Sequence, residues 1–347
     1  MRGWHSGITS SVLCVALGLI TSAAPSDKQP AIQLPHHVAV QTPPGMWFEN
    51  IAVRPNGKLL LTTLAPNASI YEVSNPAVPG KAQLARLVTV PGITSLVGIT
   101  ETSPDTYAFI GGNFTATGGV KGSWSIWTAN FHKNCDQPEV KVVAHLPDAL
   151  LPNGATTVLG NKDLILVADS FNGLVYHVNL ATGQSEVSQD FTEMKSGSDK
   201  PTAVGINGLH IRAGYLYWTN SVKHTFFRVK VTNDGHTAPD AHVETVAVLN
   251  TTFLDDFSFG PGHEDIAWVA SNTDNTLLAV NRHGKSMVVA GGTDSFTVAK
   301  STACQFGRTK DDKKILYVTT GGQTINGVTE GAKVEVIDTS GFSWAEN

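Results

Sequence analysis

The sequence predicts an all-β fold, a six-bladed β-propeller with a central ligand pocket. Two observations support this prediction. A phrase of strand, turn and strand recurs six times along the 347 residues, and 33 glycines and 17 prolines are spread through the chain rather than clustered. A chain of this length is long enough to form one such ring. No helix longer than a turn or two is expected after the N-terminus.

The repeat is clearest in the middle of the chain. Asn153-Gly154 opens one strand, and Leu164–Asp169 and Gly173–Val178 follow as runs of apolar and β-branched residues separated by turn residues. The same order recurs from Asn207-Gly208. The blades are predicted to start near Glu49, Val97, Asn153, Asn207, Asp255 and Cys304. Steps of about fifty residues are typical of propeller blades, whereas a β-sandwich would not explain the shared opening phrase.

A ring of blades needs one strand to close it, because an open blade edge leaves backbone groups unpaired. The segment Val38–Gln41 precedes the first blade and has strand-forming residues. We therefore expect it to complete the last blade.

The N-terminus has the pattern of a secretory signal peptide over residues 1–24, which leaves 25–347 for the propeller. Arg2 supplies a positive charge, Val12–Ile20 is apolar but too short to span a bilayer, and Thr21–Ala24 are small residues. A buried helix is the alternative, and the polar stretch that follows disfavours it. We expect a secreted or secretory-lumen protein.

Glycosylation and a disulfide are consistent with export. Sequons begin at Asn67, Asn113 and Asn250. Cys14 would leave with the signal peptide, so Cys135 and Cys304 would remain together in an oxidising compartment. Spacing alone does not decide whether these two cysteines pair.

Charge and hydropathy exclude two classes of partner. The net charge is −5 and no cluster of lysines and arginines occurs, which excludes the basic footprint of a nucleic-acid-binding protein. Beyond the N-terminus no apolar run approaches the length of a membrane span. Small molecules are the expected partners, and the sequence does not indicate an oligomeric state.

The first strand of each propeller blade lines the channel, so the residues that open the repeats are expected to converge there. They are Glu49, the region around Gly98, Asn153, Asn207, Asp255 and Thr302. His210 follows on the fourth inner strand, and Trp47, Phe257 and Phe114 are candidate apolar walls. The alternative is that the Asn and Asp residues only satisfy backbone groups at turns.

Several phrases resemble the superfamily of gluconolactonases and senescence-marker-type lactonases. They are Trp47–Val53, Pro152–Gly154, Ile206–Leu209 and Asp255–Phe257. The resemblance implies that Glu49, Asn153, Asn207 and Asp255 hold calcium or another divalent cation for lactone or ester hydrolysis. The chain departs from that pattern because Asp256 stands where glycine is usual and because Gly-Pro is missing around Glu49.

A closer resemblance is to secreted fungal propellers encoded with secondary-metabolite pathways, some of which are hetero-Diels–Alderases. The phrases Thr302–Thr309, Leu316–Gly322 and Trp47–Arg54 carry it. It implies a cyclase-like enzyme without a cofactor that joins a tropolone quinone methide to an olefinic terpene.

In this interpretation orientation in the pocket supplies most of the catalysis. Glu49, Asp255, Asn153 and Asn207 are the candidate catalytic residues, with a carboxylate such as Glu49 or Asp255 assisting the loss of water that forms the diene. Trp47, Phe257, Thr302, His210 and Phe114 are the candidate substrate-binding residues. A metal-dependent lactonase or esterase and a non-catalytic small-molecule-binding propeller remain the alternatives.

Overall fold

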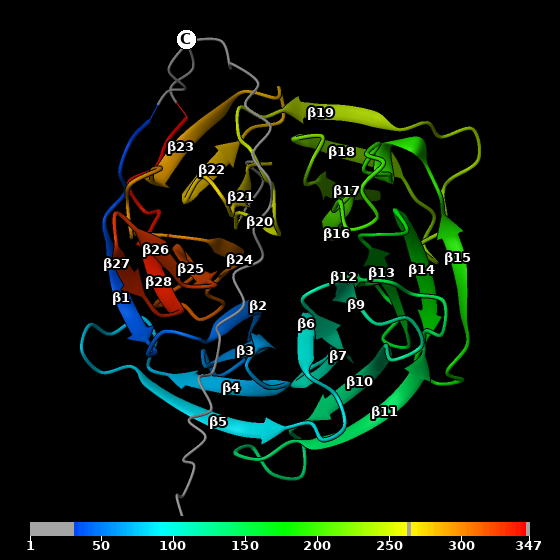
Figure 1. Ribbon diagram of the computed structural model, residues 1–347, viewed down its shortest axis with the longest axis horizontal. Helices are drawn as coiled ribbons and strands as arrows, with labels where there is room; N and C mark the ends of the chain where they lie inside the picture. Colours follow the sequence, from blue (N-terminus) through cyan, green and yellow to red (C-terminus); the bar gives the residue numbers. More distant parts are fainter. Residues whose placement is uncertain (1–30, 262–264, 345–347) are drawn as a thin grey trace, which may run out of the picture.

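The computed structural model describes residues 31–261 and 265–344, and it contains six four-stranded antiparallel sheets arranged as blades in a ring (Figure 1). The predicted all-β, six-bladed fold is confirmed. The expected signal peptide, residues 1–24, lies outside the described residues.

The first three blades follow one another along the chain. Blade 1 consists of β2 (Trp47–Val53), β3 (Leu59–Ala65), β4 (Ser69–Ser74) and β5 (Gln83–Thr89). Blade 2 consists of β6 (Ser95–Ser103), β7 (Thr106–Gly112), β10 (Ser125–Asn130) and β11 (Glu139–His145). Blade 3 consists of β12 (Pro152–Thr157), β13 (Leu164–Asp169), β14 (Leu174–Asn179) and β15 (Ser185–Gln189).

The remaining blades complete the ring. Blade 4 consists of β16 (Ile206–Arg212), β17 (Tyr215–Asn220), β18 (Thr225–Lys230) and β19 (Glu244–Val248). Blade 5 consists of β20 (Phe257–Phe259), β21 (Ala267–Ser271), β22 (Thr276–Val280) and β23 (Ser286–Gly291). Blade 6 consists of β24 (Ser301–Phe306), β25 (Ile315–Thr320), β28 (Lys333–Asp338) and β1 (His36–Gln41).

Minor elements lie between these strands. Two short hairpins are formed by β8 (Phe114–Thr115) with β9 (Gly118–Gly119), and by β26 (Gln323–Ile325) with β27 (Val328–Glu330). One 3₁₀ turn, η1, spans Thr192–Met194. Within the described residues no helix is long and apolar enough to cross a bilayer.

The core lies between the blades, with one cluster of buried apolar residues at each junction of the described ring. Successive side chains of a strand point to opposite faces. On β13, Ile165 therefore packs towards blade 2 and Leu166 towards blade 4. The middle strands are apolar at nearly every position for this reason, whereas the outer strand β15 is largely exposed.

The strand β1 closes the ring. It pairs antiparallel with β28, so the last blade contains the first strand of the chain. Val40 is buried in the cluster between blades 6 and 1, and Val38 on the same strand is 40% exposed. The pairing joins residues about 300 positions apart, His36 and Ile337 among them.

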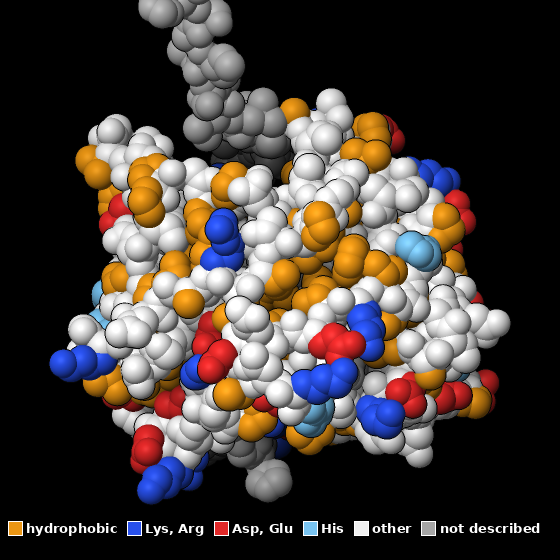
Figure 2. Space-filling model, turned by 90° about the horizontal axis from the view of Figure 1, so that it is seen from below, with side chains coloured by type: hydrophobic (Ala, Val, Ile, Leu, Met, Phe, Trp, Pro, Cys, Tyr) orange, Lys and Arg blue, Asp and Glu red, His pale blue; other side chains and the backbone are white. Residues whose placement is uncertain are grey.

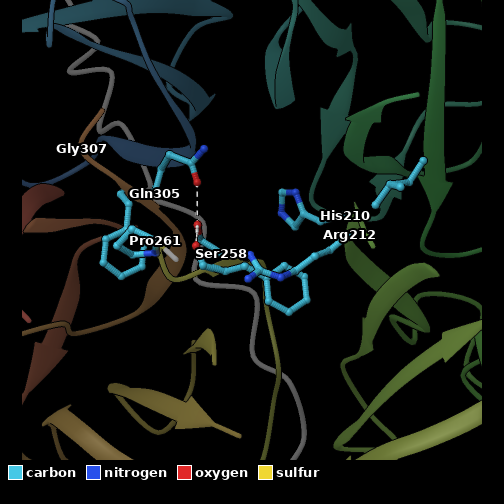
Figure 3. A pocket seen from close by; sticks show the side chains of 9 residues that line it. His210, Arg212, Ser258, Pro261, Gln305 and Gly307 are labelled. Atoms are coloured by element: carbon cyan, nitrogen blue, oxygen red, sulfur yellow. Dashed lines mark hydrogen bonds between the residues drawn. The ribbon is translucent and has the colours of Figure 1, made fainter. Parts of the chain in front are cut away.

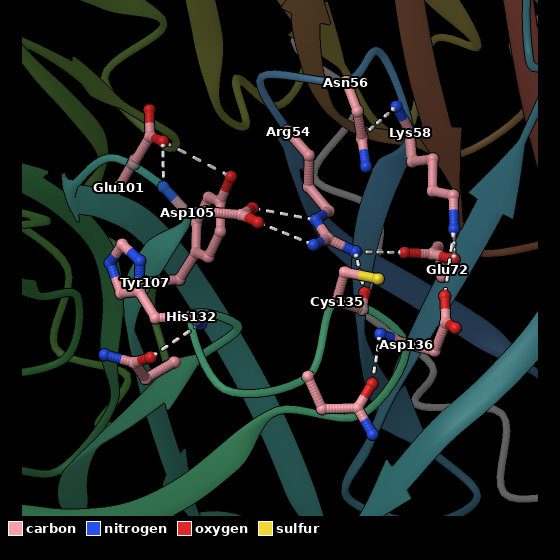
Figure 4. A network of polar contacts seen from close by, with 12 residues as sticks. Arg54, Asn56, Lys58, Glu72, Glu101, Asp105, Tyr107, His132, Cys135 and Asp136 are labelled. Carbon is pink, nitrogen blue, oxygen red and sulfur yellow. Dashed lines mark hydrogen bonds and ion pairs between the residues drawn. The ribbon is translucent and has the colours of Figure 1, made fainter.

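A buried arginine joins blades 1 and 2 (Figure 4). The Arg54 guanidinium is fully buried and donates two hydrogen bonds to the Asp105 carboxylate, at 2.8 and 2.7 Å, and one to Glu72. It also donates to the Cys135 carbonyl and stacks 3.8 Å from the centroid of the Phe131 ring. Asp105 and Glu72 thus neutralise a charge that burial alone would make costly.

The flank of the ring near β5 and β11 carries charges of both signs among neutral side chains, with apolar side chains gathered towards the middle of the view (Figure 2). Two of the three sequon asparagines, Asn67 and Asn250, are exposed. Asn113 is half-buried, and its side-chain oxygen accepts a hydrogen bond from the Thr94 amide.

The possible disulfide between Cys135 and Cys304 is not formed, and both cysteines are free. Cys135 is exposed on the connection between β10 and β11 of blade 2. Cys304 is buried on the inner strand β24 of blade 6, where its Sγ lies 3.1 Å from the Trp268 carbonyl oxygen. The two residues pack in different parts of the ring, which explains why they do not pair.

Candidate functional site

The residues that open the repeats form a buried polar cluster. Glu49, Asn153, Asn207 and Asp255 are between 3% and 8% exposed. The Asn153 amide donates a 2.7 Å hydrogen bond to the Asn207 side-chain oxygen, and Asn272 donates to Asp255 at 3.1 Å. The structure therefore connects these residues from separate blades, as the sequence suggested, but in a place that is largely closed to solvent.

Burial makes both acids of this cluster weak. Loss of solvent raises the pKa of Glu49 to about 7, with a hydrogen bond from Trp47 opposing the shift and the Asp256 charge adding to it. Burial likewise raises the pKa of Asp255 well above its usual value, and the nearby Glu49 and Asp256 charges act in the same direction. Glu49 is thus able to hold a proton near neutral pH.

The residue that follows each blade-opening residue differs between the blades. In blades 2, 3 and 4 it is glycine, because neighbouring inner strands approach too closely for a side chain. A Cβ on Gly98 would lie 2.2 Å from the Asn153 carbonyl oxygen, and one on Gly154 would lie 2.5 Å from that of Asn207. In blades 1 and 5 the same position holds Asn50 and Asp256 instead.

These two side chains meet. The Asn50 amide donates to Asp256 Oδ2 at 2.9 Å, although the residues are 206 positions apart. Asp256 Oδ1 accepts from the Phe257 backbone amide at 2.7 Å and lies 3.0 Å from His210 Nε2. With three donors, the Asp256 carboxylate is fixed in place and in turn fixes the His210 ring.

His210, Ser258 and Gln305 each stand three residues after a repeat start, and they face one another in a cavity of about 360 Å³ (Figure 3). The Ser258 hydroxyl donates to Gln305 Oε1 at 2.7 Å. This bond uses the Gln305 side-chain oxygen, so the amide nitrogen keeps its hydrogens for another acceptor. Apolar surface comes from Ile211, Phe259, Pro261 and Phe306.

A second cavity of about 280 Å³ shares His210, Gln305 and Phe306 with the first. Asn50 and Asp256 line it on one side, and Ile51, Ala52 and Ile99 add apolar surface. Both volumes are near the lower end of the range for small-molecule sites. Polar groups and apolar walls therefore face the same space at the ends of the inner strands.

Of the candidate catalytic and substrate-binding residues, His210 lines both cavities, and Cys304, the disulfide candidate, lines the second. Trp47 donates its indole N–H to Glu49 at 2.6 Å, outside the lining. Phe257 is fully buried, with its ring edge-to-face against His210 at 4.8 Å. Thr302 is buried and donates its hydroxyl hydrogen to the Phe48 carbonyl, and Phe114 packs against the core between blades 2 and 3.

Two proteins match most of the chain and carry the name "Putative hetero-Diels-Alderase". One, from Phoma sp, is 31% identical over 321 residues, which cover 86% of this chain and 90% of its own length. The chain belongs to this hetero-Diels–Alderase family. The second, asR5 from Sarocladium schorii, is 29% identical over 356 residues, covering 93% of this chain and 88% of its own length.

No family model matches the chain. Among solved structures, one described as a "putative gluconolactonase" superposes with a TM-score of 0.60 and 11% identity, covering 89% of this chain and 93% of that one. This likeness shows a shared fold.

In this member of the hetero-Diels–Alderase family, sequence reasoning missed Asn50, Asp256, Ser258 and Gln305 as cavity residues. A signal was present, because Asn50 and Asp256 replace the glycine of the repeat. Ser258 and Gln305 stand three residues after Asp255 and Thr302, as His210 does after Asn207, so this shared position was a second signal.

Proposed function

We propose that this protein catalyses the intermolecular hetero-Diels–Alder reaction of a tropolone quinone methide with an olefinic terpene in fungal secondary metabolism. The observation that carries the proposal is the pair of neighbouring cavities with shared lining residues, in which His210, Asp256 and Gln305 occur beside apolar side chains. A polar diene and an apolar alkene need such a space. Family membership supports the reaction class.

The cycloaddition mainly requires that the enzyme orient its two substrates. The cycloaddition forms two σ bonds at the expense of π bonds and releases no group, so the catalyst must hold two partners in register. Phe306 and Phe259 offer apolar surface to the terpene. The Gln305 amide is oriented by Ser258 and is the proposed donor to the quinone-methide oxygen, where charge develops.

His210 is the proposed proton-transfer group in the loss of water that generates the diene. Its Nε2 is held by Asp256, and its ring lines both cavities. Glu49 and Asp255, which the sequence suggested for this step, lie outside the cavity lining. Asp256 acts as a positioning residue, since it touches His210 and Asn50 with the same carboxylate.

The test supplies purified protein with a tropolone benzylic alcohol and an olefinic terpene, and measures both rate and stereoisomer ratio against a protein-free control. We expect one isomer to dominate. Gln305→Leu should lower kcat about 10- to 100-fold by removing one donor. His210→Gln should lower the dehydration rate by a similar factor.

The matched control is His242→Gln, because His242 is an exposed histidine outside both cavities. Its rate and isomer ratio should equal those of the wild type. Products in the protein-free isomer ratio, with no gain in rate, would contradict the proposal.

A metal-dependent lactonase is the second candidate, and the buried cluster of Glu49, Asn153, Asn207 and Asp255 favours it. Carboxylate and carboxamide oxygens suit calcium or magnesium. Burial and then the nearby charges of Glu49 and Asp256 raise the pKa of Asp255, and a cation held here would favour the ionised carboxylates. The cation would supply Lewis-acid polarisation of a lactone carbonyl.

Chelation separates the candidates. Lactone hydrolysis should stop with chelator and in Glu49→Gln or Asp255→Asn, whereas cycloaddition should continue with chelator present. A non-catalytic binding propeller would bind the tropolone or terpene without turnover in either condition.

We also propose that the protein is secreted and glycosylated. The exposure of Asn67 and Asn250 supports this, since a glycan needs an accessible asparagine. Intact-mass measurement of the natively expressed protein before and after enzymatic deglycosylation tests it, and an unchanged mass would contradict it.

A further inference from the structure

Two histidines and a glutamate meet on the outer part of the ring. His177 lies on β14 and Glu186 on β15 of blade 3, and His236 lies in the connection between β18 and β19 of blade 4. One ligand atom from each residue lies within 4.8 Å of the other two. Among the described residues this is the one group of three His, Cys, Asp or Glu side chains so arranged.

Strand register brings the first two together. His177 and Glu186 are direct partners across the β14–β15 ladder. Directly opposed residues of an antiparallel pair project from the same face of the sheet. The outer strands of blade 3 thus present an imidazole and a carboxylate side by side.

The turn that carries His236 is fastened to blade 3. The buried Gln189 amide donates to the Gly235 carbonyl at 2.8 Å. Gly235 has a φ of +89°, and a Cβ there would lie 2.9 Å from Val158 Cγ2, so the turn rests directly on blade 3. The position of His236 is therefore set by packing between the blades.

The hydrogen bond of His177 fixes which ring nitrogen is available. Nε2 lies 2.9 Å from the Asp234 carbonyl oxygen, which only accepts, so Nε2 must carry the hydrogen. In the neutral ring Nδ1 then keeps its lone pair. Metal-binding histidines usually have this arrangement, with the second nitrogen donating to a carbonyl or carboxylate.

The side chains of His177, Glu186 and His236 are close enough to bind one ion after small changes in conformation. His236 Nε2 lies 3.8 Å from Glu186 Oε1, and the two imidazole rings stack with centroids 4.7 Å apart. Ligand atoms around a tetrahedral zinc lie about 3.3 Å apart, given bonds of roughly 2.0 Å. The rings are nearly parallel, at 19°, so the His236 ring must turn out of the stack before both lone pairs point at one ion. The side chains of His236 and Glu186 are 40% and 66% exposed, which leaves room for that rotation.

We propose that His177, Glu186 and His236 bind one divalent transition-metal ion of the zinc type, which links blade 3 to blade 4. Two imidazoles and one carboxylate are the ligands that zinc accepts in proteins, with water at the fourth position. The site lies on outer strands, whereas the proposed reaction uses residues of the inner strands. It is therefore independent of the proposed function.

The test titrates Zn²⁺ into tag-free, chelator-treated full-length protein by calorimetry at pH 7.5, a pH at which imidazole is mostly neutral. We expect one equivalent to bind and the thermal midpoint to rise by a few degrees, since the ion stabilises the state that binds it. His236→Gln and His177→Gln should each weaken binding at least about 10-fold and remove the thermal shift.

The His242→Gln variant is the matched control and should bind as the wild type does. Co²⁺ provides a second readout, because its visible absorption reports imidazole ligation and should be lost in His236→Gln. An equal affinity in wild type and both histidine variants, or no saturable binding in the wild type, would overturn the proposal.

Discussion

At the scale of single residues, two adjacent aspartates have different surroundings in the folded protein. Asp255 and Asp256 are adjacent, yet Asp255 joins the buried cluster and Asp256 lines a cavity. The two acids consequently have different surroundings. Asp256 accepts hydrogen bonds from Asn50, Phe257 and His210, whereas burial raises the pKa of Asp255.

The raised pKa of Glu49 predicts a pH dependence of stability. Between the ordinary pKa of 4.5 and the folded value of about 7, the folded protein holds a proton that the unfolded chain has lost. The free energy of unfolding therefore falls as pH rises through this window, by up to about 3 kcal/mol for this group.

Glu49→Gln should reduce that fall, because the amide mimics the protonated acid at every pH. Urea unfolding of both proteins at pH 5 and pH 8 measures it, and Asp255 should leave a remaining slope in the variant. Parallel curves for the wild type and Glu49→Gln would show that Glu49 titrates normally.

At the scale of elements, β1 offers a matched pair of substitutions. Val40 is buried in the cluster between blades 6 and 1, and Val38 is exposed on the same strand. Val40→Asp should lower the free energy of unfolding by about 2–4 kcal/mol, since it buries an unpaired charge. Val38→Asp should cost less than about 1 kcal/mol.

Urea denaturation of the two variants checks this expectation. An equal loss in both would mean that β1 contributes to stability through its backbone pairing with β28, with little from its packing against blade 1.

At the scale of the whole molecule, the ring depends on contacts between blades. Arg54 of blade 1 is fully buried, and in Arg54→Ala its partner Asp105 would lose its counter-charge, while Glu72 would keep only its ion pair with Lys58. We expect a loss of about 3–5 kcal/mol in the free energy of unfolding.

Lys121→Ala is the control for this prediction. Lys121 pairs with Asp148 at 3.1 Å, but both side chains are more than half exposed, so the loss should stay below about 1 kcal/mol. Chemical denaturation measures both variants, and similar losses would argue against a special contribution of the buried arginine.

The ring of six blades could be predicted from the amino-acid sequence alone. The repeats from Glu49 to Cys304 showed the period, and the apolar runs such as Leu164–Asp169 follow from blades that pack on both faces. These are local patterns, because each blade repeats one arrangement of strands. From its position on an inner strand, His210 could point into the channel or into its blade, and the structure places it in the cavity lining.

The residues that line the cavities could not be predicted from the sequence and required the three-dimensional structure. The pairing of β2 with β3 shifts register between Phe48 and Asn50, and that of β16 with β17 shifts between Ile206 and Leu209. A β-bulge inserts an unpaired residue and re-aims its neighbours, so alternation alone does not assign the face. Contacts such as Asn50 with Asp256 arise because ring closure brings distant inner strands together, and sequence spacing carries no measure of that approach.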